Sequence, residues 1–416
     1  MTSNFSSELS EKDEKYKWYI LALATVTGTF VSAIPFSCMP VLFKEISDDL
    51  GLDLVQVGTI WGIASLAGIF ISIIAGLLSD RFGMKNILSI FCILVGITGA
   101  LRGFSNSFSI LALTVFLNGI VRLIIPITVT KAIGIWFRGK NLGMAMGVGA
   151  LGMGLGLMLG PLISATILSP ALGGWQNVMH FYGALSAVVG ILWILFGREP
   201  SQVGPTTAAS GTVPLRQALS RLVRLKDLWF IGLTLLFRVG CLMGMTGYLP
   251  LYLREQRGWE IAAADGTLAA FYAISTILVV PLCFLSDKIG SRKVILYVAL
   301  ILTIGCVGLL PIVEDGTIWI LMLLAGIFMD GFMSLIVTML LETEGVGPVY
   351  SGTALGIVFT IVHLGSVISP PLGNSLDSIG QEAPFFFWAS LSVAALVMLF
   401  FIKETGWRRA VTARSE

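Results

Sequence analysis

The ten residues from position 76 to 85 read Gly76-Leu77-Leu78-Ser79-Asp80-Arg81-Phe82-Gly83-Met84-Lys85, and they recur in altered form as Cys283-Phe284-Leu285-Ser286-Asp287-Lys288-Ile289-Gly290-Ser291-Arg292. An aspartate, a glycine and a basic residue match at one offset of 207 residues. A second motif, Gly147-x8-Gly156-x3-Gly160-Pro161, returns as Gly356-x8-Gly365-x3-Ser369-Pro370 at an offset of 209. Two motifs that repeat at nearly one spacing predict a duplicated architecture.

The composition is that of a membrane protein. Of the 416 residues, 56% are hydrophobic and only 12% are charged, and the mean hydropathy is +0.91. Soluble domains carry about 25% charged residues. The cysteines lie in apolar stretches without disulfide or metal spacing: Cys38, Cys92, Cys241, Cys283 and Cys306. We therefore expect neither a disulfide framework nor a metal centre, and we interpret the first apolar run as a retained span.

Apolar runs of about 20 residues predict twelve transmembrane helices. They cover residues 18–42, 56–79, 85–104, 108–136, 141–168, 175–197, 227–252, 263–286, 293–312, 317–341, 351–373 and 384–403. The chain is thus predicted to be an all-α integral membrane protein with two pseudo-symmetric six-helix bundles. The predicted parts are a tail (1–17), a first bundle (18–197), a linker (198–226), a second bundle (227–403) and a tail (404–416). The basic, amphipathic end of the linker, from Leu215 to Lys226, predicts a short interfacial helix.

Basic residues predict the orientation of the chain. The tails, the linker and the loops on their side carry nineteen lysines and arginines, whereas the opposite side carries only Lys44, Arg102, Arg254 and Arg257. The positive-inside rule therefore places both termini in the cytoplasm.

The repeated loop gives the chain a family resemblance. Gly76-x3-Asp80-Arg81-x-Gly83-x-Lys85 resembles the signature loop between the second and third helices of the major facilitator superfamily, although Met84 and Cys283 depart from its pattern. The resemblance implies two bundles that rock about a central cavity lined by helices 1, 4, 7 and 10. It also implies a gating motif on the cytoplasmic side, made of Gly76, Asp80, Arg81, Gly83, Lys85, Asp287, Gly290 and Arg292. The alternative is a loop that sets only the topology.

Four ionisable residues near mid-span are the candidate functional groups: Arg122, Arg238, Asp330 and His363. Such a group costs about 2.5–3.5 kcal/mol at the bilayer centre, so each requires a partner or a function. Arg122 and Asp330 are 208 residues apart, which makes them near-equivalent positions of the two halves. We expect them to face each other across the pathway.

These residues favour an anionic substrate. Guanidinium groups bind oxyanions in a forked geometry, so Arg122 and Arg238, with Asn118 one turn before Arg122, are the predicted substrate-binding residues. Protonation of Asp330 or His363 would release an arginine, which predicts proton coupling, as in a symporter. Alternatively, Arg122 and Asp330 only join the bundles, and His363 only bonds a neighbouring helix.

The glycine motif is a competing signal. Gly147, Gly156, Gly160 and Pro161 permit close helix packing, and they resemble a motif of drug–proton antiporters, although Ser164-Ala165 replaces its closing glycines. The stretch from Lys131 to Gly147 resembles instead the anion and monocarboxylate branches. Spans 2 and 8 lack the mid-span arginine of nitrate porters. The balance favours a small organic or inorganic anion over a drug.

Other classes of function fit less well. The chain shows no nucleophile–base set for an enzyme and no Gly-x4-Gly-Lys-Ser/Thr loop for an ATP-driven pump. A non-transporting receptor of the same fold remains an alternative. We expect a monomer in the plasma (inner) membrane of a bacterium or archaeon, with no cofactor and no nucleic-acid partner. Its expected partners are a small anion, protons and the lipid bilayer.

Overall fold

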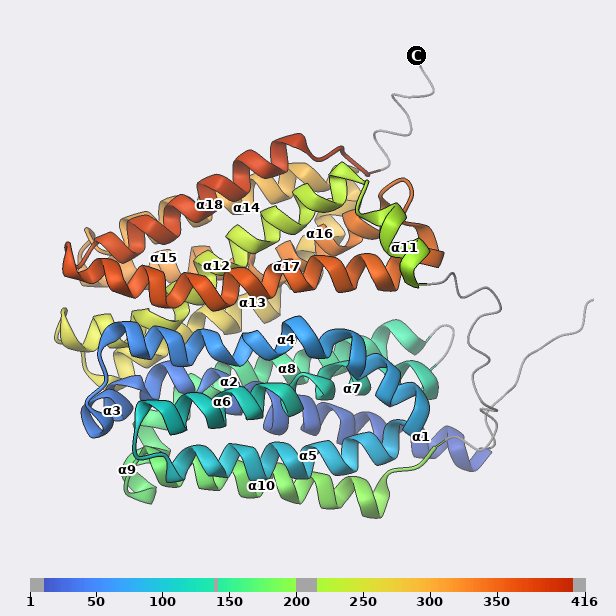
Figure 1. The fold of residues 1–416 in the computed structure, drawn as a ribbon, viewed down its shortest axis with the longest axis horizontal. Coiled ribbons are helices and arrows are strands. Elements are labelled where there is room, and N and C mark those ends of the chain that lie inside the picture. Colours follow the sequence, from blue (N-terminus) through green and yellow to red (C-terminus); the bar gives the residue numbers. More distant parts are fainter. Residues whose placement is uncertain (1–10, 138–140, 200–214, 407–416) are drawn as a thin grey trace, which may run out of the picture.

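The computed structural model describes residues 11–137, 141–199 and 215–406; within them, the side chains of 11–13, 72–77, 79–81, 215–216 and 348–349 are not described. The described chain forms two stacked groups of helices (Figure 1). Twelve of its helical segments are long and apolar enough to cross a membrane. The predicted all-α architecture with twelve spans is confirmed.

The first bundle begins with a discontinuous span. It consists of α1 (Glu11–Thr27), a π-helical segment (Gly28–Ala33) and α2 (Ile34–Ser37), and α3 (Met39–Leu50) continues beyond it. Prolines at positions 35 and 40 stand at the starts of α2 and α3, where a missing N–H is tolerated. The rest of the bundle comprises α4 (Leu54–Phe82), α5 (Met84–Leu101), α6 (Phe108–Arg122), α7 (Ile124–Trp136), α8 (Leu142–Ile163), α9 (Ser169–Leu172) and α10 (Trp175–Phe196).

The second bundle repeats this plan after the short linker helix α11 (Leu215–Leu222). It comprises α12 (Lys226–Glu255), α13 (Ile261–Ile289), α14 (Arg292–Leu309), α15 (Asp315–Ile327), α16 (Met329–Glu342), α17 (Gly347–Ser375) and α18 (Ala383–Phe401). The linker helix packs on this bundle, because Leu222 is fully buried in its core.

Both ends of the described chain lie on one side of the molecule. We call the side where α1 begins and α18 ends the terminus side, and the side of α3 and α9 the distal side (right and left in Figure 1). Large apolar side chains such as Val280, Phe284 and Phe400 are about 70% exposed. Their exposure is expected where helices face lipid.

The two bundles are joined in the distal half of the molecule. Trp61 Nε1 of α4 donates to Met243 O of α12 at 2.7 Å, and Arg254 Nη1 donates to Val41 O at 2.8 Å. Lys44 Nζ lies 2.8 Å from Glu255 Oε1. Hydrogen bonds to the carboxylates of Asp48 and Glu255 raise the pKa of Lys44. Hydrogen bonds and an ion pair therefore close the distal side.

The terminus half is open between the bundles. A cavity of about 940 Å³ lies there, and both bundles contribute to its wall. It is lined mostly by apolar side chains of α7, α11, α12 and α17, and His363 stands at its inner end. The structure is thus closed on the distal side and hollow on the terminus side.

Candidate functional site

Arg122 and Asp330 lie at corresponding places of the two halves. Arg122 is the last residue of α6, next to Leu123, which separates α6 from α7 in the fourth span. Asp330 lies in the first turn of α16, after Phe328, which separates α15 from α16 in the tenth span. The distortion is slight at Leu123, whose dihedral angles are helical (φ −64°, ψ −18°) and whose N–H donates to Gly119 O at 3.2 Å, and it is larger at Phe328 (φ −101°, ψ 6°). The two halves therefore place charges of opposite sign beside a local distortion of the helix.

Arg122 lies on an aromatic ring rather than beside a carboxylate. Its guanidinium carbon is 4.5 Å from the centroid of the Phe36 ring, within range of a cation–π interaction. Asp330 is held elsewhere: Ser275 Oγ donates to its carboxylate at 2.6 Å, and its own N–H donates to Ser275 Oγ at 3.0 Å. Within the described part of the chain, no ion pair joins Arg122 to Asp330. A direct ion pair between them, the alternative in which they only join the bundles, is therefore absent from the described structure, whereas their facing each other across the pathway stays a prediction.

Arg238 of α12 is the most isolated charge. Its side chain is 1% exposed, and Nε, Nη1 and Nη2 all lack a hydrogen-bond partner in the described structure. Its one aromatic contact is the Phe332 ring, 5.4 Å from the guanidinium carbon. A buried charge left without a partner costs several kcal/mol. The guanidinium donors of Arg238 are therefore unused in the described structure.

Asn118 and His363 are held by their own neighbours. Asn118 Nδ2 donates to Thr98 Oγ1 at 3.0 Å and to Val95 O at 3.3 Å, so its donor group serves helix α5. His363 Nδ1 lies 2.6 Å from Phe359 O, and a Cβ on Gly68 would overlap the imidazole ring. His363 thus stands where α17 of the second bundle touches α4 of the first.

The first gating motif is described only in part. The side chains of Asp80 and Arg81, and residue Gly76, lie outside the described side chains. Gly83 has a φ of +78°, which favours glycine. The start of α5 is capped by the segment that follows α10, because Lys85 N donates to Glu199 Oε1 at 3.0 Å.

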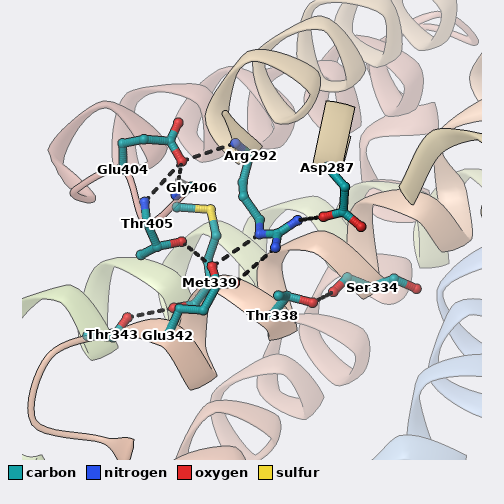
Figure 2. Close-up of polar contacts among 10 residues, drawn as sticks. All are labelled: Asp287, Arg292, Ser334, Thr338, Met339, Glu342, Thr343, Glu404, Thr405 and Gly406. Atoms are coloured by element: carbon teal, nitrogen blue, oxygen red, sulfur yellow. Dashed lines mark hydrogen bonds and ion pairs between the residues drawn. The ribbon is translucent and has the colours of Figure 1, made fainter. Parts of the chain in front are cut away.

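The second copy of the motif forms a polar cluster on the terminus side (Figure 2). Arg292 donates to Asp287 at 2.8 Å and to Glu342 at 2.9 and 3.1 Å, and Gly290 has a φ of +73°. Glu404 accepts the backbone N–H groups of Arg292 and Lys293. The cluster ties together the ends of α13, α14, α16 and α18.

Sequence reasoning missed the two capping glutamates. Glu199 and Glu404 each follow the last span of a bundle and accept N–H groups from the start of α5 or α14, where a helix dipole favours negative charge. Burial raises the pKa of Glu404, but hydrogen bonds from Ser291 and from the backbone N–H groups of Gly406, Arg292 and Lys293 outweigh burial and lower it. A basic residue followed by glutamate just after each bundle was the available signal.

The glycine motif lies against the first span. A Cβ on Gly156 would come within 2.8 Å of Thr29 O, and one on Gly160 within 3.1 Å of Ile34 O, whereas Gly147 faces open space. Pro161 is buried inside α8. Thr29 Oγ1 also donates to Gly152 O at 2.7 Å. Thr29 of the first span therefore contacts α8.

One basic residue of the distal side is buried. Arg102 lies on the predicted side, in a 3₁₀ turn, Arg102–Phe104, at the end of α5, and it is only 3% exposed. Its Nη1 donates to Pro35 O and its Nε to Gly99 O, both at 3.3 Å. Its side chain therefore turns into the bundle, a direction that hydropathy does not reveal.

Comparisons with known proteins agree with this architecture. The sequence model of the Major Facilitator Superfamily matches residues 25–343 and 262–416. The chain is 25% identical over 412 residues to the nitrite extrusion protein of Bacillus subtilis, covering 95% of each chain. It is 26% identical to the probable sulfoacetate transporter SauU of Cupriavidus necator, covering 89% of this chain and 90% of the relative. It is 21% identical to the hexuronate transporter of Escherichia coli, covering 93% and 94%.

Solved structures show the same fold at low sequence identity. A bacterial homolog of the human lysosomal transporter Spinster, in an inward-facing and unoccupied conformation, superposes with a TM-score of 0.72 at 17% identity, over 93% of this chain and 95% of that one. A point mutant of the nucleoside transporter NupG gives a TM-score of 0.77 at 13% identity, over 92% and 99%. The chain belongs to the Major Facilitator Superfamily of multi-pass membrane transporters, nearer to its anion-type branches than to a multidrug pump.

Proposed function

We propose that this protein is a secondary active transporter of a small organic or inorganic anion, working by alternating access in the plasma membrane with both termini in the cytoplasm. One observation gives this proposal its main support. Three arginines in the membrane domain, Arg102, Arg122 and Arg238, have no carboxylate within ion-pair distance in the described structure. A bound anion would supply the missing countercharge.

The closed distal side and the open terminus-side cavity support a mechanism of alternating access. The distal side is closed by contacts between the bundles, and the cavity of about 940 Å³ opens on the terminus side. With the termini in the cytoplasm, this arrangement is inward-facing. Transport then requires a second state in which the distal contacts part.

Proton coupling would act through Asp330, and His363 is the second candidate. The side-chain partner of Asp330 is the hydroxyl of Ser275, and no cation pairs with it among the described residues. A buried carboxyl without a paired cation accepts a proton more readily than one in a salt bridge, because no neighbouring charge favours the ionised form. Relatives with names such as nitrite extrusion protein and hexuronate transporter support the anionic substrate class.

Uptake into proteoliposomes tests the proposal. Nitrate, nitrite, sulfoacetate and glucuronate are compared with lipophilic cations, with and without an inward proton gradient, for wild type, Arg238→Gln and the control Arg221→Gln. Arg221 is a suitable control because it stacks on Tyr350, outside the bundle core. Anion uptake that Arg238→Gln loses and Arg221→Gln keeps is the expected result. Movement of no anion by the wild type would contradict the proposal.

Efflux of a lipophilic solute is the second candidate function. It is favoured by the apolar wall of the large terminus-side cavity. The same experiment decides between them, because in that case only the lipophilic cations move and Arg238→Gln has no effect.

A further inference from the structure

A small second cavity lies in the distal half of the first bundle, apart from the large one. It measures about 10 Å³, room for roughly a single water. Its wall contains Arg102 and Arg122 together with Asn118, Phe36 and Trp61, all from the first bundle. Two guanidinium groups that line one small cavity repel each other, so this arrangement costs free energy unless a negative group binds between them.

Arg102 has a free donor at this cavity. Its Nε and Nη1 are used by the backbone carbonyls of Gly99 and Pro35, but Nη2 is buried without a hydrogen-bond partner in the described structure. A Cβ added to Gly99 would lie 3.5 Å from Arg102 Nη2 and 3.7 Å from Asn118 Nδ2. Arg102 Nη2 is therefore the unused donor beside Gly99, since Asn118 Nδ2 already donates to Thr98 Oγ1 and Val95 O.

An aromatic stack connects this cavity to the contact between the bundles. The Arg122 guanidinium lies over Phe36, and Phe36 stacks on Trp61 with the ring centroids 4.7 Å apart. Trp61 in turn donates to Met243 O, and its ring lies against Gly247 of the second bundle. Separation of the bundles on the distal side would remove the support of Trp61 and uncover both arginines.

We infer that Arg102 and Arg122 form a second anion site, which binds a small oxyanion group when the distal side opens and which Trp61 closes when the bundles meet. This inference rests on the proposed transport of anions and adds Arg102 as a binding residue. The ligand is either a whole inorganic ion such as nitrate or the carboxylate or sulfonate group of an organic anion. The site is the first to meet an anion arriving from the distal side, and Arg238 lies in the other bundle.

Transport kinetics from each face test the inference. Nitrate and glucuronate uptake are measured in right-side-out and inside-out membrane vesicles for wild type, Arg102→Gln, Arg102→Lys and the control Arg257→Gln. Arg257 is a matched distal arginine that also donates to backbone carbonyls, those of Val313 and Pro311, but lines neither cavity. For entry from the distal face, Arg102→Gln should raise the half-saturating concentration about tenfold with little change in maximum rate. Arg102→Lys should raise it about threefold, because the charge stays and the fork is lost.

The possible results distinguish failure of the second anion site from failure of the proposed anion transport. A rise for nitrate alone assigns the site to an inorganic ion, and a rise for both anions assigns it to an oxyanion group. An unchanged half-saturating concentration, or a loss of maximum rate alone, shows that Arg102 only supports the turn at Pro35 and overturns the inference while transport stands. If Arg102→Gln does not accumulate in the membrane, the same criterion is applied to Arg102→Lys. A wild type that moves no anion contradicts both.

Discussion

The first bundle gathers Arg102 and Arg122 around one small cavity, whereas the second keeps Arg238 and Asp330 on separate partners, a phenyl ring and a serine hydroxyl. The backbones nevertheless correspond: the helix is locally distorted in the fourth and tenth spans, and a glycine of positive φ stands at positions 83 and 290. The two halves therefore share a backbone plan and differ in their buried charged groups. In the function proposed above, arginines of both bundles bind the anion and Asp330 of the second bundle carries the proton.

The largest expected effect is at Arg238. Arg238→Met replaces an unpartnered buried charge with an apolar side chain of similar length. Anion uptake should fall by about 100-fold or more, while the midpoint of thermal unfolding should rise, because replacing buried charge by apolar groups often stabilises by about 1–4 kcal/mol. Uptake assays and thermal unfolding of the same preparation measure both quantities. A variant that is less stable than wild type would mean that Arg238 has a partner in the folded protein.

The second effect concerns Asp330. Asp330→Asn keeps a side chain that can hydrogen-bond Ser275 but cannot release a proton at physiological pH. Uptake driven by a proton gradient should fall about tenfold or more, while exchange of labelled for unlabelled anion should remain. His363→Gln, tested in parallel, shows whether the second candidate contributes. Gradient-driven uptake by Asp330→Asn at the wild-type rate would remove Asp330 as the proton carrier.

A smaller effect is expected at the distal contact. Trp61→Phe keeps an aromatic ring on Phe36 but removes the N–H that donates to Met243 O. The loss of one hydrogen bond, about 1 kcal/mol, should shift the population toward the distal-open state about fivefold. The distance between spin labels attached at Leu172 and Ile379, exposed distal residues of the first and second bundle, measures the shift, with Trp229→Phe as a control on the terminus side. Equal distance distributions in both variants would show that this bond does not hold the distal side.

The smallest expected effects are on stability, and they differ between the two capping glutamates, Glu404 and Glu199. Glu404 accepts hydrogen bonds from Ser291 and several backbone N–H groups, whereas Glu199 is exposed and caps Lys85. Glu404→Gln should therefore destabilise the protein by about 1 kcal/mol and Glu199→Gln by less. The pKa of Glu404 is below its ordinary value of 4.5, so its contribution is complete above pH 4.5 and is lost as the pH falls through the lowered pKa. Unfolding measured at pH 7 and near pH 3 would reveal this dependence, and equal costs in the two variants would contradict the ranking.

Some of these features were predictable because they depend on position along the chain. Span count, duplication and the mid-span charges follow from hydropathy and spacing, and the helix distortions beside Arg122 and Asp330 fall where the two halves align. The direction of a side chain does not follow from the sequence. Arg102 lies at the end of an apolar run on the predicted side, but hydropathy cannot tell that its side chain turns inward to Pro35 O. Sequence spacing likewise cannot tell that the Arg122 guanidinium lies over the Phe36 ring.

Anion-dependent unfolding shows whether the buried arginines bind an anion. Purified wild type and Arg238→Met are unfolded thermally in nitrate, sulfoacetate or glucuronate at constant ionic strength. A ligand at 100 times its dissociation constant stabilises the folded state by about 2.7 kcal/mol. We expect at least one anion to raise the unfolding midpoint of the wild type and to leave that of Arg238→Met nearly unchanged. A wild type that no anion stabilises, or equal stabilisation of both proteins, would contradict this expectation.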